Sequence, residues 1–251
     1  MLKSRVIPCL QMREGLLYKT RQFGDPRYIG DPINAVRIFN EKEVDELMIC
    51  DIGREVILDE AQLKLIEKCS ISARMPLTYA GGVKSVEDAE TIVRLGIEKC
   101  GIRSLFFRDK QEIKNISLAI GSQSTIVCLD ARKVNGNWMA LNPNNNSYQS
   151  LEKCIDFAQS SGSGEIFLTH IDSDGMDFDY NYELHDYVAK YLSVPCVISG
   201  GINDISVINN IIERYWPIGI GVSSLFLFKG KLKAFLISYY DTLQRQQPTG
   251  Q

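Results

Sequence analysis

The chain repeats a set of short sequence marks at a nearly constant spacing. Each mark in the first half recurs 119 or 120 residues later and in the same order. The recurring marks are Cys9 with Cys128, Glu46 with Glu165, Gly81-Gly82 with Gly200-Gly201, and Ser104-Leu105-Phe106 with Ser224-Leu225-Phe226. Such order indicates two halves with the same succession of strands and loops. We therefore expect one domain built from half-units at about residues 1–120 and 121–245.

Short β-rich runs alternate with amphipathic helical patterns along the whole chain. The expected strands are 5–11, 46–51, 77–80, 99–103, 125–130, 165–170, 196–199 and 218–222. Helices are expected at 32–40, after the N-cap Asp31, and at 85–95, capped by Ser85. This alternation requires a parallel sheet, and eight units with a half repeat predict a closed (β/α)8 TIM barrel. An open doubly wound sheet is the alternative, but it would not explain why the halves match.

Composition is that of an ordinary globular enzyme. Of the 251 residues, 45% are hydrophobic and 24% charged, which argues against disorder. The net charge of -3, without a basic cluster, argues against nucleic acid as a partner. No apolar run reaches the roughly 20 residues that a membrane span needs, and the N-terminus leads directly into a strand. We therefore expect a cytoplasmic protein.

Cysteine and histidine provide few candidates for metal or disulfide chemistry. The seven cysteines show no Cys-x-x-Cys spacing, and most are expected to be reduced core residues. The two histidines are His170 and His185. The segment 170–174 could hold a cation, but a loop without metal is the favoured reading. We expect neither a metal nor a cofactor.

The two diglycines are candidate phosphate cradles. Gly81-Gly82 and Gly200-Gly201 follow strands three and seven, just before helices, where small residues let a phosphate approach backbone amides. Ser104 and Ser224, after strands four and eight, add donors at the same two places. One such turn alone is more often structural. Two equivalent sites at one barrel mouth suit a ligand with a phosphate at each end, or one descended from such a ligand.

Nearly the whole chain resembles the cyclase subunit of imidazole glycerol phosphate synthase. The segments that carry the resemblance are 5–10, Lys19, Asp51-Ile52, Ala80-Gly81-Gly82-Val83, Asp130, Arg132-Lys133, Gly164-Glu165-Ile166 and Ile171-Asp172-Ser173-Asp174-Gly175. In that family the barrel takes ammonia from a separate glutaminase subunit and joins it to a substrate with phosphate at both ends. The resemblance implies that Asp174 and Gly175 belong to a phosphate site and that Lys19 is a catalytic candidate, which reaches an anionic group at the mouth.

The family uses two opposed aspartates, at the ends of strands one and five, as general acid and base. One is retained as Asp130, but the other position holds Gln11, whose amide cannot transfer a proton at neutral pH. Such a group is worth about 10² to 10⁴ in rate. We therefore expect efficient cyclisation to be lost. The alternative is that Gln11 is a tolerated variant and Asp130 does both jobs.

Other departures lie at the same end of the barrel. Ala80 stands where the family has a third glycine, and residues 142–147 stand where its substrate loop should be. Arg103 stands where the family has asparagine, and its planar guanidinium suits carboxylate or phosphate. Changes concentrated at the catalytic end suggest a changed or lost substrate.

Four charged residues fall at the starts of strands, at the opposite end. Arg5, Glu46, Lys99 and Glu165 could form a closed ring of two cations and two anions. The resemblance implies that this ring is the gate through which ammonia enters from a glutaminase docked at this face. The other reading is four solvated charges that stabilise the barrel floor.

Three functions remain open at this point. The stretch 30–46 resembles a paralogous branch associated with amidation of sugars for bacterial surface polysaccharides, next to a glutaminase and a sugar-modifying amidotransferase. We favour an ammonia-conducting subunit of this kind. The alternatives are a working cyclase of histidine biosynthesis and a scaffold that activates a glutaminase without conducting ammonia.

Two segments carry weaker expectations. Residues 12–30 exceed the usual strand-to-helix connection, so we expect a mobile lid or docking surface there. The tail from Gln244 to Gln251 reads as a frayed terminus.

Overall fold

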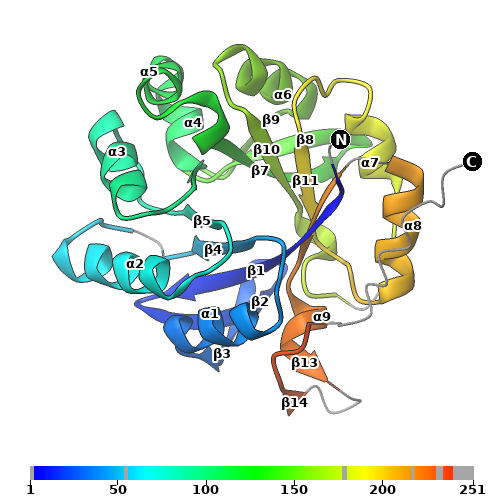
Figure 1. Cartoon of the computed structure of the whole chain (residues 1–251). Helices are drawn as coiled ribbons and strands as arrows, with labels where there is room; N and C mark the ends of the chain where they lie inside the picture. Colours follow the sequence, from blue (N-terminus) through cyan, green and yellow to red (C-terminus); the bar gives the residue numbers. More distant parts are fainter. Residues whose placement is uncertain (1–2, 54–55, 177–179, 216–217, 230–233, 240–251) are drawn as a thin grey trace, which may run out of the picture.

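Eight parallel strands close into a barrel in the computed structural model, which describes residues 3–53, 56–176, 180–215, 218–229 and 234–239 (Figure 1). The barrel strands are β1 (Arg5–Arg13), β4 (Leu47–Asp51), β5 (Leu77–Ala80), β6 (Lys99–Ile102), β7 (Thr125–Val134), β10 (Glu165–His170), β11 (Cys196–Ser199) and β12 (Gly219–Val222). Each pairs with the next in this order, and β12 pairs with β1, where Arg5 lies beside Gly219. The predicted (β/α)8 barrel is confirmed, and the open sheet is excluded.

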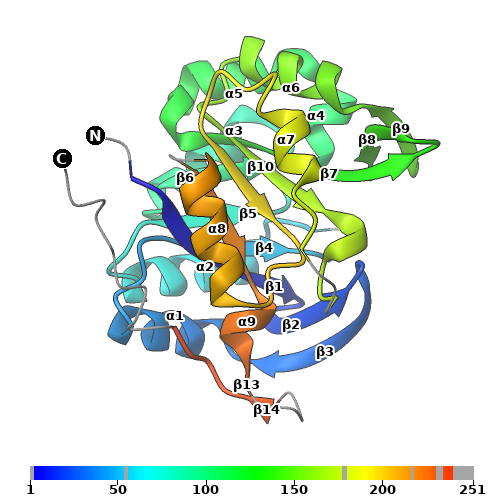
Figure 2. The ribbon, with the colours of Figure 1, turned by 90° about the vertical axis from the view of Figure 1, so that its right-hand side faces the viewer.

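Helices surround the barrel, as Figures 1 and 2 show from two sides. They are α1 (Pro32–Glu41), α2 (Glu60–Ser72), α3 (Val86–Arg94), α4 (Ser104–Arg108), α5 (Lys110–Ile120), α6 (Leu151–Ser160), α7 (Glu183–Val188), α8 (Ile205–Tyr215) and α9 (Ser224–Leu227), with 3-10 turns at Ser122–Ser124 and Ile171–Ser173. The predicted caps form. The Asp31 side chain accepts a hydrogen bond from the Asn34 amide at 2.8 Å, and Ser85 accepts one from the Asp88 amide at 3.2 Å. These side chains satisfy amides that the first turn leaves free.

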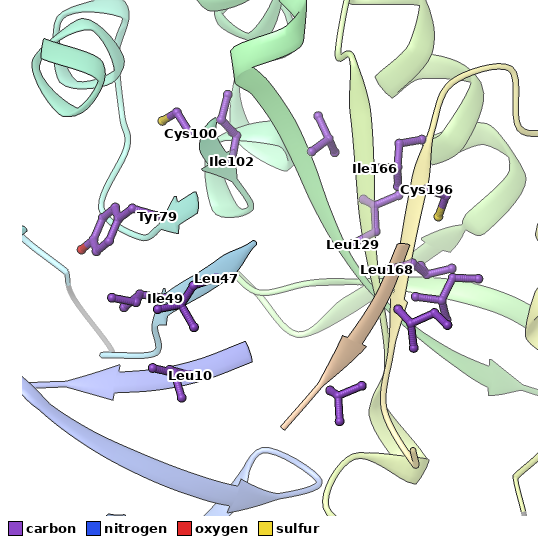
Figure 3. Close-up of a cluster of buried hydrophobic side chains, with 14 of the residues drawn as sticks. Leu10, Leu47, Ile49, Tyr79, Cys100, Ile102, Leu129, Ile166, Leu168 and Cys196 are labelled. Carbon is purple, nitrogen blue, oxygen red and sulfur yellow. The ribbon is translucent and has the colours of Figure 1, made fainter. Parts of the chain in front are cut away.

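The main hydrophobic core lies between the barrel wall and the helices. Side chains alternate between the two faces of a strand, so every second residue of a barrel strand points outward. Figure 3 shows such residues on neighbouring strands, including Leu10, Ile49, Leu129 and Ile166. All four are at most 2% exposed. Burial of this layer against the helices fixes the register of the strands and hence which side chains point into the barrel.

Two β-hairpins extend the barrel, one in each half. Strands β2 (Leu16–Arg21) and β3 (Gly24–Gly30) continue from β1, and strands β8 (Asn137–Asn142) and β9 (Ser147–Ser150) continue from β7. The sequence analysis did not predict these strands within residues 12–30, where a mobile lid or docking surface was expected. The segment is β-structure, and its Leu17, Lys19 and Thr20 are less than 5% exposed.

The turn that leads from the barrel strand into each hairpin has the same backbone conformation. Glu14-Gly15 has φ of 52° and 75°, and Asn135-Gly136 has φ of 51° and 80°. Two successive positive φ values give the tight turn that matches strand twist, and Asn-Gly is its strongest sequence mark. Asn135-Gly136 was thus a readable hairpin mark that the sequence analysis did not use.

Several smaller expectations can also be compared with the structure. All seven cysteines are free, and six of them are buried, as expected. Among the described residues, no helix has the length and apolar character of a membrane span. A short pair of strands, β13 (Phe228–Lys229) and β14 (Ala234–Phe235), follows α9. The tail from Gln244 onward lies outside the described residues.

Candidate functional site

A second, smaller cluster of buried side chains fills the barrel interior. Its members come from six different barrel strands, which only the inside of a closed barrel can bring together. They are Ile7, Cys9, Met48, Ala80, Ile126, Cys128, Phe167 and Val197, with Cys50 packed against them. The cluster consists of aliphatic, aromatic and thiol side chains. Burial raises the pKa of Cys9 and Cys128, so these thiols stay neutral. The shaft, as we call these nine residues, is therefore uncharged.

Period-two alternation places charged residues directly below this shaft. Arg5 precedes Ile7 by two residues, Glu46 precedes Met48, and Glu165 precedes Phe167. The four residues predicted at the floor come together in the structure. Arg5 donates through Nη1 to Glu46 and through Nη2 to Glu165. Lys99 Nζ contacts Glu46 Oε2 at 3.2 Å and Glu165 Oε2 at 2.9 Å. Cations and anions thus alternate around a closed ring.

The floor ring is largely withdrawn from solvent. Exposed fractions of the side chains are 24% for Arg5, 12% for Glu46, 16% for Lys99 and 5% for Glu165. Burial alone would lower the pKa of Arg5, but the charges of the two carboxylates outweigh it and raise that pKa. The reading of four separately solvated charges is therefore wrong. Because each charge has two opposite neighbours, no ring member is buried unpaired.

The same alternation places polar residues above the shaft, at the barrel mouth. Gln11 follows Cys9 by two residues, and Asp130 follows Cys128. Gln11 Oε1 accepts hydrogen bonds from the Thr20 amide at 2.8 Å and from Thr20 Oγ1 at 3.0 Å. The amide oxygen of Gln11 therefore fastens the β2–β3 hairpin. Thr20 was missed in the sequence, because no strand was predicted within residues 12–30.

Asp130 does not stand free at the mouth, because Arg103 is bound to it. Arg103 Nε donates to Asp130 Oδ2 at 2.5 Å, and Nη2 contacts the same oxygen. The Asp130 side chain is 7% exposed. Burial raises the pKa of Asp130; the Arg103 charge opposes this shift, and the nearby charge of Asp174 adds to it. The predicted catalytic carboxylate is thus engaged by the residue that departs from the family pattern.

Lys19 lies at the mouth as expected, and it is deeply buried. Its Nζ bonds Asp174 Oδ1 at 2.8 Å, and the two side chains are 4% and 8% exposed. Gln22, at the hairpin tip, donates its backbone amide to the Asp174 carbonyl at 2.9 Å and its side chain to the Asp172 carbonyl at 2.8 Å. The hairpin therefore lies against the segment after β10. Gly175 makes this approach possible, because a Cβ there would stand 2.6 Å from the Thr20 carbonyl oxygen.

The second-half cradle is an open pocket at the mouth. Its lining residues include Asp174, Gly175, Ser199, Gly200, Gly201, Ser223 and Ser224. Among the described residues, Asp174 Oδ2 and Ser223 Oγ are buried and have no hydrogen-bond partner. Buried polar atoms of this kind need a partner, which a ligand can supply. A hydrogen-bond donor for Asp174 Oδ2 and a partner for Ser223 Oγ would satisfy these two atoms.

The first-half cradle is closely packed as well. Gly81 has φ of 152° and Gly82 has φ of 72°, conformations that favour glycine. A Cβ on Gly81 would stand 2.6 Å from Asp51 Cβ, and one on Gly82 would stand 3.0 Å from Leu58 Cγ. These glycines thus also serve close packing against the segment after β4. Ser104 begins α4, and its carbonyl accepts from Asn144 Nδ2 at 2.9 Å, so the 142–147 turn reaches this cradle.

The histidines take no part in this constellation. His170 Nδ1 lies 2.8 Å from Ser173 Oγ, and its ring stands edge-on to Trp138. His185 is 2% exposed and packs among Tyr180, Tyr182 and Tyr215. Within the part of the chain that the structure describes, no group of three or more metal-binding side chains forms.

Comparison with known proteins decides the family. Residues 5–233 match the family model described as "Histidine biosynthesis protein". A Vibrio vulnificus protein is 40% identical over 98% of this chain and 96% of its own length, and a Pseudomonas aeruginosa protein is 38% identical over 96% and 97%. The chain belongs to the imidazole glycerol phosphate synthase cyclase family.

Within the cyclase family, the relatives that match the chain over nearly its whole length are named only provisionally. The names of the two relatives assign them provisionally as synthase subunits and carry the numbered symbols hisF3 and hisF2. An Exiguobacterium sibiricum protein named without this reservation as the synthase subunit HisF is 32% identical over 80% of this chain and 82% of its own length. The chain is thus a member of the cyclase family, and its substrate has to be argued from the site.

Proposed function

We propose that this cyclase-family barrel receives ammonia from a glutaminase at its floor and conducts it to the mouth without closing an imidazole ring. The observation that carries the proposal is the arrangement of one continuous interior. An ion-paired ring lies at the floor, and the uncharged shaft lies above it. The mouth follows, where Gln11 is hydrogen-bonded to Thr20 and Asp130 is paired with Arg103. An uncharged shaft suits neutral ammonia and disfavours ammonium, because an unpaired charge is costly to bury.

The floor ring supports a glutaminase as the partner. Arg5, Lys99 and the two glutamates are held by one another, and a docked protein that offers replacement partners would favour opening of the ring. A transient break in the Lys99 contacts would open a route beside a single flexible side chain. The ring therefore suits a gate that stays closed until the glutaminase is bound.

The mouth supports an acceptor other than the cyclase substrate. Gln11 cannot ionise, and its oxygen is occupied by Thr20. Asp130 is paired with Arg103. Closure of the imidazole ring needs a positioned general acid and a positioned general base. In this arrangement neither Gln11 nor Asp130 is free to transfer a proton to the substrate. The working-cyclase alternative therefore requires Arg103 to leave and Asp130 to act alone.

We further propose that the nitrogen is destined for a surface-polysaccharide sugar, with a separate amidotransferase accepting it above the mouth, in the cytoplasm. This part rests on the resemblance of residues 30–46 to the polysaccharide branch and on the similarity to numbered additional copies. The second-half pocket is lined by Gly200, Gly201 and an unpartnered Asp174 oxygen, and we place the phosphorylated and hydroxylated end of the ligand beside it.

The test is to block the shaft. Met48 is 2% exposed and lies in the interior cluster, so Met48→Trp should narrow the path. Cells that lack the native gene would receive the native chain, Met48→Trp, or the control Leu118→Trp at a position 77% exposed. We expect the shaft variant to bind glutaminase and support glutamine hydrolysis but to abolish sugar amidation, read by mass spectrometry of the polysaccharide. Undiminished amidation with Met48→Trp would favour the non-conducting scaffold.

A further inference from the structure

Arg103 connects three elements at the barrel mouth. It lies between β6 and α4, and its Nε donates to Asp130 Oδ2 on β7. On the other side, its guanidinium carbon lies 5.6 Å from the centre of the Phe23 ring. Phe23 occupies the turn between β2 and β3, with φ of 66°. The guanidinium is therefore held between a carboxylate of the barrel and the tip of the hairpin.

The equivalent position in the second half shows that the backbone does not require an arginine. Ser223 lies 120 residues later and precedes α9 as Arg103 precedes α4. Their backbones are nearly the same, with φ and ψ of -119° and -72° at Arg103 and -119° and -74° at Ser223. In the second half this position presents a small hydroxyl to an open pocket. The first half presents a permanent cation instead, so the cation needs a chemical explanation.

Arg103 has unused capacity for an anion. Its side chain is 39% exposed, whereas that of Asp130 is 7% exposed. Guanidinium has five N–H donors in a planar fork that matches carboxylate and phosphate oxygens. Two of its nitrogens are directed at one oxygen of Asp130, which leaves the solvent-facing edge available. An incoming anion can therefore bind this edge and compete with Asp130.

Asp130 can give up its partner by taking a proton. The groups that face it are Arg103 at the β6 end, Asp174 after β10, Thr169 on β10, Cys50 on β4 and Cys128 on its own strand. Burial raises the pKa of Asp130 and the charge of Asp174 raises it further, while Arg103 holds it down. Once an anion neutralises Arg103, the buried carboxyl becomes easier to protonate. The exchange then leaves no unpaired buried charge.

We propose that Arg103 is the receptor for an anionic group, carboxylate or phosphate, of the molecule that reaches the mouth, and that this anion replaces Asp130 as its partner. The hairpin is part of the exchange, because Phe23 rests on the same guanidinium. The inference refines the proposed function by giving the charge of the acceptor. Binding of the anion does not itself require ammonia.

The experiment follows the Arg103 Nε–H resonance in the full chain by ¹⁵N NMR, with its assignment from Arg103→Met. Inorganic phosphate and glucuronate are the two probes and separate a phosphate from a sugar carboxylate. We expect one of them to shift the resonance saturably, with proton uptake seen by calorimetry in two buffers. Affinity should fall roughly tenfold or more in Arg103→Met, the worth of a charge-assisted hydrogen bond. Arg214→Met, at an exposed ion pair with Asp186, should bind as the native chain does.

Two results would overturn the inference. In the first, calorimetry shows that a probe has saturated its binding site, but neither probe shifts the Arg103 resonance. The other is equal affinity in the native chain and Arg103→Met, which would place the anion elsewhere. Phosphate held only in the second-half pocket would shift the Gly201 amide and leave Arg103 unchanged. If Met48→Trp still blocks amidation in that case, the proposal of ammonia conduction is supported and only the proposed role of Arg103 is refuted.

Discussion

The floor ring makes a quantitative prediction about stability. Arg5→Met removes a cation that bonds both Glu46 and Glu165, whose side chains are 12% and 5% exposed. The two carboxylates then share Lys99 alone. Breaking a fully buried pair costs about 3–5 kcal/mol, and an exposed pair contributes about 1 kcal/mol or less. Because the Arg5 side chain is 24% exposed, we expect a loss of about 2–4 kcal/mol in the free energy of unfolding.

Urea unfolding at neutral pH measures this loss, provided that the slope m is unchanged. The matched control is Lys64→Met, which breaks an i,i+4 pair with Glu60 whose side chains are 63% and 83% exposed, and should cost about 0.5 kcal/mol or less. The double variant Arg5→Met/Glu46→Gln leaves Lys99 paired with Glu165 and should recover part of the loss. A cost for Arg5→Met no larger than the control, or strictly additive single costs, would refute the idea of a coupled ring.

Three further predictions concern the hairpin anchor, a buried histidine and a close backbone contact. Lys19→Met should lower the free energy of unfolding in urea by about 3–5 kcal/mol and speed amide exchange in β2, because it leaves Asp174 buried without a cation. The double variant Lys19→Met/Asp174→Asn should be less destabilised, and an equal loss in both variants would contradict this. Burial lowers the pKa of His185 to about 4, so the folded state binds fewer protons and stability should fall by about 3 kcal/mol as pH drops from about 6.5 to about 4. The pH dependence of native minus His185→Gln stability isolates this contribution, and a flat difference would rule it out. Gly164→Ala should lower the free energy of unfolding by over about 2 kcal/mol, because its Cβ would stand 2.3 Å from the Ser122 carbonyl oxygen. Gly121→Ala, whose Cβ would have no atom within 4 Å, should lower it by about 1 kcal/mol in the same assay. Similar losses in the two variants would contradict the close contact.

Much of the fold followed from the sequence because strand period and repeat spacing are local properties. The β-rich runs gave all eight barrel strands, with ends mostly within one or two residues. The floor ring also followed, since alternation puts Arg5 and Ile7 on one face of β1. The hairpins were missed because residues 12–30 were read as a connection, although Asn135-Gly136 marked the equivalent turn in the other half.

The mouth could be predicted in composition but not in pairing. The sequence placed Gln11, Asp130 and Arg103 at one end of the barrel, yet it could not show which partners they choose. The Arg103–Asp130 pair depends on the rotamer of a long side chain and on the position of Phe23, which only the folded hairpin determines. The bond between Gln11 and Thr20 likewise depends on the hairpin folding back across β1.

The central claim is that this barrel has kept the ammonia path and lost ring closure. The direct measurement is ammonia-dependent turnover of the family's cyclase substrate, which carries phosphate at both ends. The native chain, Gln11→Asp and Gln11→Asp/Arg103→Asn would be compared. We predict no turnover by the native chain, little by the single variant because Arg103 still holds Asp130, and measurable activity in the double variant. Native turnover at the rate of a family cyclase would contradict the account and make the protein an enzyme of histidine biosynthesis.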